Sequence, residues 1–367
     1  MKKTILAALS IFTLATIAAS QDVIRNSAKP SNPKAGRVLS LKEEMRIEDT
    51  GRGFFFKNPS AIRVSAQGDI LVKDGQDQVL QFDSQGRFLR NLFKNGQGPG
   101  ELSSVYSIGV STDRAYLLGY PLKILAFDAQ GTLVLETDLR ETAKYGPTSM
   151  ILADREHYLL RSLGPPERPA GSGLADFPNY LFKVSPGGAV TKAGVFPIQG
   201  YYEVLANGGT SWSFFNSVQI APISDNFLAV NSSPEYLVGV FDIDKETILR
   251  RFARPYRRVK RSSEGGVSGG GNAPPPPEFD QDIRALHAVD GKIWVQTSTV
   301  DEQKGILFDV YDVEGRYLDY FYIPTVGKSS KNKPINMTLT ITGGCAYFRD
   351  KTEDDLIIIK KCRLVGL

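Results

Sequence analysis

Phe82-Asp83-Ser84-Gln85-Gly86 recurs along the chain as Phe127-Asp128-Ala129-Gln130-Gly131, and three weaker copies follow. The weaker copies are Val184-Ser185-Pro186-Gly187-Gly188, Phe241-Asp242-Ile243-Asp244-Lys245 and Tyr311-Asp312-Val313-Glu314-Gly315. Intervals of about 45 to 70 residues are typical of propeller blades rather than of helical repeats. The aspartate can bond its own backbone, and the glycine supplies a positive φ. The repeat therefore predicts a tight turn between two strands of each blade.

The clearest repeat unit runs from Pro59 to Arg90 and shows four short apolar runs separated by turn residues. Such a unit is typical of one blade of a β-propeller. Weaker units follow over residues 107–139, 148–193, 213–252, 283–323 and 337–364. The last unit offers only three strands, and residues 37–47 have strand character. The sequence therefore predicts an all-β fold over residues 37–367, a six-bladed β-propeller whose ring is closed by an N-terminal strand joining the last blade.

The N-terminus has the pattern of a secretory signal peptide over residues 1–20. Lys2 and Lys3 precede an apolar stretch, and small residues stand before Gln21. We expect a protein that is periplasmic or secreted, with no transmembrane segment after cleavage. Residues 21–36 are expected to form a flexible lead. Residues 258–278, rich in glycine and proline, are expected to be a disordered insertion.

Charge and cysteine content limit the function. The formal net charge of +4 includes the basic signal residues, so nothing indicates nucleic-acid binding. Cys345 and Cys362 are the two cysteines, and they flank a turn in the last unit. Because an exported protein meets oxidising conditions, we expect a structural disulfide between them. The alternative is that they are two small buried apolar residues.

The segment Gly96-Gln97-Gly98-Pro99-Gly100-Glu101 follows the first unit. Together with Gly68 to Val72 and the first turn, it resembles bacterial six-bladed β-propeller proteins related to NHL repeats. The resemblance covers almost the whole mature chain and is strongest over the first two blades. It implies the fold, and it implies that the segment connects two blades, with Glu101 accepting backbone hydrogen bonds. Many relatives have no assigned activity, so it implies little about function.

In a propeller, loops between second and third strands share a face with loops between blades, around the central channel. On that face we expect candidate ligand-binding residues. They are Asp74, Asp77, Tyr120, Arg161, Glu235, Asp301, Arg349 and Asp350. Carboxylates, guanidinium groups and an aromatic ring suit a polar ligand such as a peptide or glycan. The alternative is a solvated polar rim.

A metal or nucleophilic site has less support in the sequence. Zinc usually takes several nitrogen or sulfur ligands, and the chain has only His157 and His287, both expected near the first turn of their blades. Calcium needs only oxygens, which Asp74, Asp77, Glu235 and Asp301 could supply. No Gly-x-Ser-x-Gly motif is present. The metal therefore stays unassigned, with calcium as the one possible cofactor.

A basic run precedes the glycine-rich insertion. Its members are Arg250, Arg251, Arg254, Arg257, Arg258, Lys260 and Arg261. It could contact an anionic surface, or it could be a linker kept soluble by its charge.

The sequence as a whole favours an exported, non-catalytic binding or protein-interaction propeller of the cell envelope. Its partner would be an envelope protein, a peptide or a glycan, held on the channel face. The alternative is a calcium-dependent hydrolase or lyase with an oxygen-ligated ion in the central channel.

Overall fold

The computed structural model describes residues 22–49, 51, 53–140, 146, 149–153, 156–166, 171–205, 207–261, 277–324 and 339–367. The expected signal peptide, residues 1–20, lies outside this part of the chain. All regular elements within it are β strands, which confirms the all-β prediction.

Within the same described part of the chain, no helix has the length and apolarity that crossing a membrane would require.

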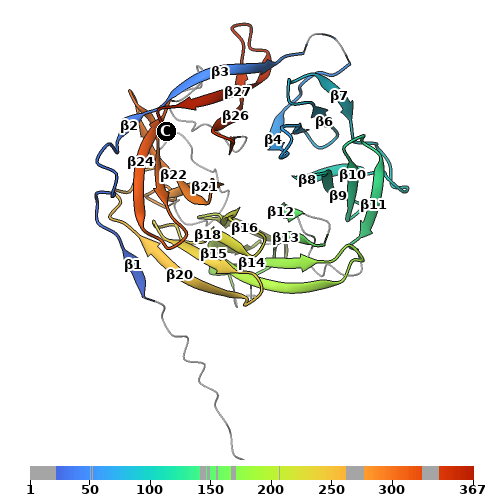
Figure 1. Ribbon diagram of the computed structural model, residues 1–367. Coiled ribbons are helices and arrows are strands. Elements are labelled where there is room, and N and C mark those ends of the chain that lie inside the picture. Colours follow the sequence, from blue (N-terminus) through green and yellow to red (C-terminus); the bar gives the residue numbers. More distant parts are fainter. Residues whose placement is uncertain are drawn as a thin grey trace, which may run out of the picture.

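Six β sheets are arranged as blades around a common axis (Figure 1). The first blade contains β4 (Pro59–Val64), β5 (Ile70–Asp74), β6 (Val79–Phe82) and β7 (Phe88–Asn91). The second contains β8 (Ser104–Val110), β9 (Arg114–Tyr120), β10 (Lys123–Asp128) and β11 (Leu133–Asp138). The third contains β12 (Ser149–Ala153), β13 (Tyr158–Leu163), β14 (Gly173–Val184), β15 (Val190–Val204) and β16 (Thr210–Phe214).

Each of the remaining three blades includes one strand from the N-terminal segment. The fourth has β17 (Gln219–Pro222), β18 (Phe227–Asn231), β19 (Val238–Asp242), β20 (Thr247–Ala253) and β1 (Val23–Arg25). The fifth has β21 (Ile283–Val289), β22 (Lys292–Asp301), β23 (Gly305–Tyr311), β24 (Tyr317–Ile323) and β2 (Arg37–Val38). The sixth has β25 (Thr340–Thr342), β26 (Cys345–Lys351), β27 (Ile357–Val365) and β3 (Ser40–Ile47).

The innermost strands contact one another in the order β4, β8, β12, β17, β21, β25 and back to β4. Apolar clusters fill the spaces between blades. Leu71 of the first blade and Leu117 of the second share one cluster, and Phe82 of the first and Tyr347 of the sixth share another. Burial of a large apolar side chain contributes roughly 1.5–3 kcal/mol. The first and last blades therefore pack together directly.

The N-terminal segment runs along the outer edges of the last three blades. β1 pairs in parallel with β20, β2 pairs in parallel with β24, and β3 pairs antiparallel with β27. Between the first two pairs, the N–H of Gly36 donates to the Tyr320 carbonyl at 2.8 Å. The prediction of a flexible lead over residues 21–36 is therefore wrong from Val23 onward. Backbone hydrogen bonds to neighbouring strands hold this polar segment in place, although it buries few apolar side chains.

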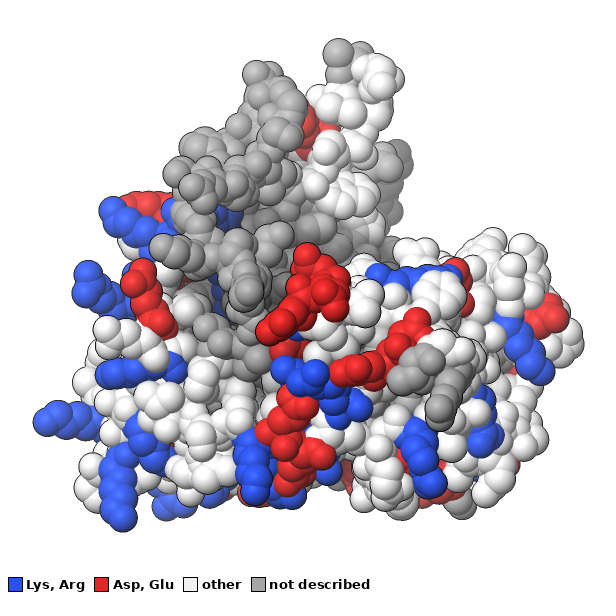
Figure 2. Space-filling model, turned by 90° about the horizontal axis from the view of Figure 1, so that it is seen from above, with Lys and Arg blue, Asp and Glu red and all other residues white. Residues whose placement is uncertain are grey.

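Charged pairs reinforce the contact between β3 and β27. Glu44 accepts from Nε of Arg363 at 2.8 Å, and Lys360 lies 3.4 Å from Glu43. Figure 2 shows acidic and basic side chains interspersed on the face of the molecule that it presents, rather than one large patch of either sign. Exposed pairs of this kind contribute little individually, so the apolar side chains of the segment matter more for stability.

The repeated turn has the predicted form. Oδ1 of Asp83 accepts the N–H groups of Gln85 at 3.0 Å and Arg87 at 2.9 Å, and Gly86 has a φ of 79°. The turn joins β6 to β7, the third and fourth strands of its blade. Asp128 and Asp312 accept equivalent bonds in the second and fifth blades.

The glycine-rich segment at residues 96–101 connects the first two blades, as predicted. Oε2 of Glu101 accepts the N–H of Gly98 at 3.1 Å. From the second blade, Lys123 donates to the Gly98 carbonyl at 2.7 Å and pairs with Glu136 at 2.8 Å. These contacts hold the connection in place and give it a structural role.

Cys345 and Cys362 are both free and buried, so the predicted disulfide is wrong in this structure. In the pairing of β26 with β27, Cys345 lies opposite Arg363, whereas Cys362 lies opposite Ala346. This offset of one residue sends the two thiols to opposite faces of the sheet. Cys345 packs toward the first blade and Cys362 toward the fifth. Both cysteines therefore act as the small buried apolar residues of the alternative interpretation.

A buried polar cluster joins the fourth and fifth blades around Asp309. This fully buried carboxylate accepts the hydroxyls of Tyr236 and Tyr317, each at 2.7 Å, and lies 2.7 Å from Nη2 of Arg254. Burial, together with the Asp309 charge, raises the pKa of Tyr236 well above its usual value. Burial opposes the charge of Arg254, but Asp309 outweighs it and raises the pKa of that guanidinium. The cluster is ionic, and its members satisfy one another.

Candidate functional site at the inner wall

Asp74, the first predicted ligand residue, holds the backbone of its own blade. It is fully buried, and its carboxylate accepts the N–H of Lys57 at 2.7 Å, the N–H of Asn58, and Nε2 of Gln78 at 3.2 Å. Burial raises the pKa of Asp74, and the two backbone bonds partly oppose that rise. The carboxylate therefore fixes the segment that leads into β4.

Two other predicted residues meet Asp74 at the same place. Asp77 pairs with Nζ of Lys57 at 2.7 Å. Arg349, from the sixth blade, donates to Oδ1 of Asn58 at 2.7 Å. The structure thus brings Asp74, Asp77 and Arg349 together at the junction of the sixth and first blades, where they bind protein groups.

The other five predicted residues make their contacts elsewhere. Arg161 donates to the Val218 carbonyl at 2.8 Å and so links the third blade to the fourth. Asp301 accepts the N–H groups of two residues in its turn, and Asp350 pairs with Lys360 at 2.9 Å. Tyr120 and Glu235 are exposed. Ligand binding by these eight residues stays a prediction.

The carboxylates do not fit the calcium ion of the alternative function. Asp74, Asp77 and Asp301 are engaged as described, and Glu235 lies in a different blade from each of them. Across the residues that the structure describes, no group of three or more His, Cys, Asp or Glu side chains is placed to hold a metal ion.

Most of the basic run is paired with acidic groups. Arg254 pairs with Asp309, and Arg258 lies 3.1 Å from Asp282. The further pairs are Arg250 with Glu314, Lys260 with Glu278 and Arg261 with Asp280. Binding to an anionic surface stays a prediction, carried by Arg251 and Arg257, which have no ion pair among the described residues.

Both ends of the expected disordered insertion are ordered. The N–H of Arg261 donates to the Glu278 carbonyl, and the N–H of Asp280 donates to the Val259 carbonyl, both at 2.9 Å. The prediction of disorder is therefore wrong for residues 258–261 and 277–278. Residues 262–276 lie outside the described part of the chain.

The six innermost strands, which we call the inner wall, have an unusual charge composition. Over their described lengths, β4, β8, β12, β17, β21 and β25 contain no Asp or Glu. Arg63, Arg284 and His287 are the basic side chains there. His287 lies within β21, shortly before the turn that leads to β22, as expected. Arg63 was not among the predicted site residues, although a charged residue within a short apolar strand could have indicated it.

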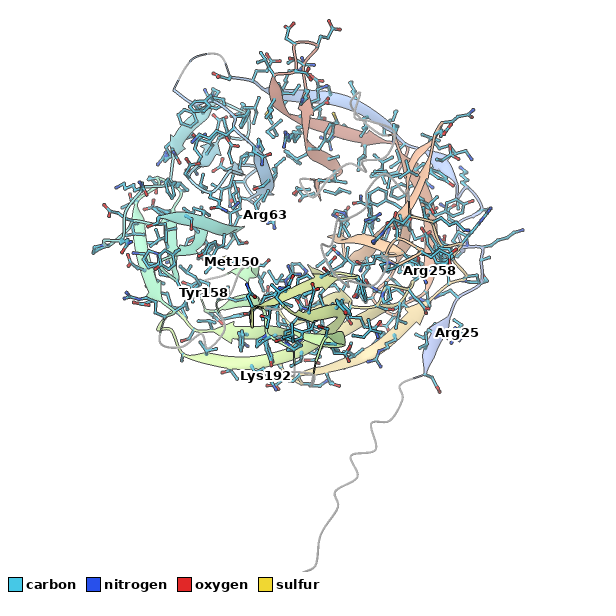
Figure 3. The ribbon with its side chains drawn as sticks, turned by 180° about the vertical axis from the view of Figure 1, so that it is seen from behind. Arg25, Arg63, Met150, Tyr158, Lys192 and Arg258 are labelled. Atoms are coloured by element: carbon cyan, nitrogen blue, oxygen red, sulfur yellow. The ribbon has the colours of Figure 1, made fainter. Side chains whose placement is uncertain are left out.

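Arg63 lies at the inner side of the first blade (Figure 3). Its Nη1 donates to the Ile62 carbonyl at 3.0 Å, and the hydroxyl of Thr340, from β25, donates to the same carbonyl at 2.7 Å. Burial lowers the pKa of Arg63 from its usual value. The guanidinium thus lies where the first and sixth blades meet.

His287 extends this region to the fifth blade. Its Nε2 lies 3.3 Å from Oε1 of the buried Gln296, and its ring is 6.0 Å from that of Phe308. Burial lowers its pKa to about 4; the bond to Gln296 opposes this shift, and the positive charge of Arg63 adds to it. The ring is therefore neutral at pH 7.

Solvent reaches the inner wall. Tyr106 on β8 is 38% exposed, and Arg63, Gln219 and His287 are half-buried. The wall thus presents an aromatic ring, a guanidinium group and an imidazole. The described lengths of the inner strands carry no carboxylate, and the side chains present there can contact a polar ligand.

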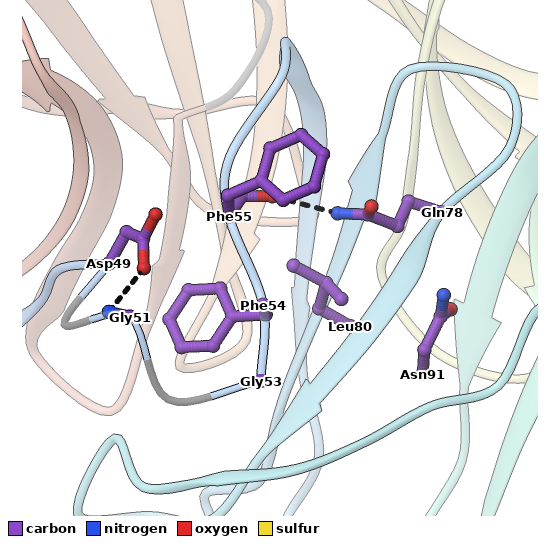
Figure 4. A pocket seen from close by; sticks show the side chains of 8 residues that line it. All are labelled: Asp49, Gly51, Gly53, Phe54, Phe55, Gln78, Leu80 and Asn91. Atoms are coloured by element: carbon purple, nitrogen blue, oxygen red, sulfur yellow. Dashed lines mark hydrogen bonds between the residues drawn. The ribbon is translucent and has the colours of Figure 1, made fainter.

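A cavity of about 360 Å³ lies outside the inner wall, beside the first blade (Figure 4). Its polar side chains bond to the protein itself. Gln78 donates to the Phe55 carbonyl at 2.8 Å, Asp49 accepts the N–H of Gly51 at 2.7 Å, and Asn91 accepts the N–H of Val79 at 3.0 Å. These polar groups have partners already, and the cavity is a weaker candidate than the inner wall.

Comparison with known proteins supports the propeller fold. A family model described as a 6-bladed beta-propeller (DUF5128) matches residues 48–161. The crystal structure of a candidate exported protein from Bacteroides fragilis is similar, with a TM-score of 0.51 and 11% identity, covering 94% of this chain and 99% of that one. The WD40 β-propeller domain of Doa1 has a TM-score of 0.43 and 9% identity, covering 88% and 97%. The comparison with curated proteins gave no match.

Proposed function

We propose that the chain is an exported, non-catalytic propeller of the cell envelope that binds a ligand at its inner wall. The observation that carries this proposal is the solvent-reachable set of Arg63, Tyr106 and His287 on the innermost strands. The ligand would be a peptide, a glycan or a segment of an envelope protein. The signal-like N-terminus and the likeness to a candidate exported protein support a periplasmic or secreted location.

Two finer statements belong to the same proposal. The relationship to NHL-repeat propellers rests on the glycine-rich segment at residues 96–101. Closure of the ring by an N-terminal strand is supported by the pairing of β3 with β27. The calcium-dependent hydrolase or lyase is not carried further, because the inner strands supply no carboxylate.

Ligand binding at the inner wall is testable by thermal unfolding with a panel of envelope peptides and oligosaccharides. A ligand that binds only the native state raises the melting temperature, and the rise grows with the ratio of ligand concentration to Kd. We expect at least one class to do so in the wild type and to lose its effect in Tyr106→Ala. Phe227→Ala is the matched control, because Phe227 is equally exposed, at 37%, on a strand outside the inner wall.

The response of Phe227→Ala shows whether a lost ligand effect is specific to the inner wall. The proposal predicts that Phe227→Ala keeps the wild-type response. Equal loss in both variants, or no response to any member of the panel, would contradict binding at the inner wall.

A further inference from the structure

The positive charge of the inner wall is only partly balanced. Arg284 lies 2.7 Å from Asp280, and it also donates to Oγ of Ser298 at 3.1 Å. Arg63 has no carboxylate within ion-pair distance among the described residues; its one hydrogen bond goes to the Ile62 carbonyl. The guanidinium of Arg63 is therefore half-buried without a counter-charge.

The open geometry of Arg63 contrasts with that of Arg37 in the same protein. Nη1 of Arg37 reaches both carboxylate oxygens of Asp319, at 3.1 and 2.9 Å. In Arg63, Nε and Nη2 have no hydrogen bond to a described residue. These two groups lie on one edge of the guanidinium plane, and that edge matches two oxygens of a carboxylate or phosphate.

Among the described residues, the two neighbours Thr340 and His287 bring no negative charge to Arg63. Thr340 anchors the same Ile62 carbonyl from β25, and β25 lies between β4 and β21, the strands of Arg63 and His287. Nδ1 of His287 makes no hydrogen bond to a described residue. A half-buried charge without a partner costs free energy, and a bound anion would offset that cost.

We propose that Arg63, with His287 beside it, binds the oxyanion group of a ligand, a carboxylate or a phosphate. This inference rests on the proposed function, because it names the chemical class of the ligand at the same wall. The guanidinium supplies the positive charge and a bidentate hydrogen-bond contact. The neutral imidazole donates through Nε2 to Gln296, so it is a positioning group beside the guanidinium and supplies no further donor.

The test is a calorimetric titration of the mature chain at constant ionic strength with three probes: sodium galacturonate, galactose and potassium phosphate. Galacturonate and galactose differ in a carboxylate, so the pair isolates the charge. We expect one oxyanion to bind at least about tenfold more tightly than galactose. A preference for galacturonate indicates a carboxylate ligand, and a preference for phosphate indicates a phosphorylated one.

Arg63→Gln is expected to weaken that binding about tenfold or more. Arg25→Gln, the matched control at an exposed arginine on the outer strand β1 with no ion pair among the described residues, is expected to bind as the wild type does. If Arg63→Gln fails to fold, Arg63→Lys serves as the second variant. It keeps the positive charge but cannot make the bidentate contact, so it should also weaken binding.

Three outcomes overturn the inference: neither oxyanion binds, galactose binds as well as galacturonate and phosphate, or Arg63→Gln and Arg25→Gln behave alike. The first two leave the proposed function standing if an uncharged ligand still needs Tyr106. If no ligand of the panel binds in a way that depends on Tyr106, the proposed function itself is refuted.

Discussion

Replacing Asp309 by alanine is expected to lower the free energy of unfolding by about 3–5 kcal/mol. The substitution leaves the guanidinium of Arg254, whose side chain is 10% exposed, buried without its counter-charge. It also removes the acceptor of the Tyr236 and Tyr317 hydroxyls. The uncompensated buried charge and the loss of a shared acceptor should loosen the contact between the fourth and fifth blades. Urea unfolding followed by tyrosine and tryptophan fluorescence measures the loss.

Glu314→Ala is the control for the Asp309 prediction. Glu314 pairs with Arg250 at the surface, where its side chain is 57% exposed, and removal of such a pair should change stability by less than about 1 kcal/mol. If Asp309→Ala were no more destabilising than Glu314→Ala, the buried cluster would not hold the two blades together.

Deleting residues 22–48 is expected to abolish cooperative unfolding of the remaining chain. The deletion removes β1, β2 and β3 from the edges of three blades and leaves the edge of β27 unpaired. It also removes Leu39 and Ile47, which are 0% and 2% exposed in two different apolar clusters. Circular dichroism during thermal unfolding would show a broad or absent transition.

A milder pair of variants tests the same segment in a folded protein. Leu39→Ala should cost about 2–5 kcal/mol, the usual range for a buried leucine. Val38→Ala is the matched control, since Val38 is the preceding residue and is 46% exposed, so its loss should be small. Equal effects of the two substitutions would show that the N-terminal segment is not part of the core.

The turns and blades were predictable from the sequence because their physical causes are local. Asp83 and Gly86 determine their turn through a side-chain bond and a positive φ within five residues. Gly96 and Glu101 determine the blade connection in the same way. An added Cβ at Gly96 would collide with the Glu101 carboxylate, so glycine is required there.

Features that depend on register or on long-range pairing could not be predicted. Cys345 and Cys362 lie across one hairpin, and only the strand register shows that they face opposite ways. β15 extends over 15 residues and pairs with β16, although the sequence placed Ser213 of β16 in the next blade. Asn207-Gly208 between them favours a hairpin, but it does not show whether that hairpin lies within one blade or joins two.

The candidate site was predicted only in outline. The loop residues were chosen because they are polar, but Asp74 and Arg349 satisfy backbone and side-chain groups of neighbouring blades. Arg63 and His287 come together through three blades, and no local pattern links residues so far apart in the sequence. The absence of acidic residues from the inner strands becomes visible only once those strands are known.

The measurement that tests the account most directly is the pKa of His287 by NMR, in the wild type and in Arg63→Gln. The account predicts a pKa of about 4 in the wild type and a higher pKa in the variant, because a nearby positive charge disfavours the protonated ring. A His287 pKa near the ordinary value of 6.5, unchanged by Arg63→Gln, would contradict the inner-wall site.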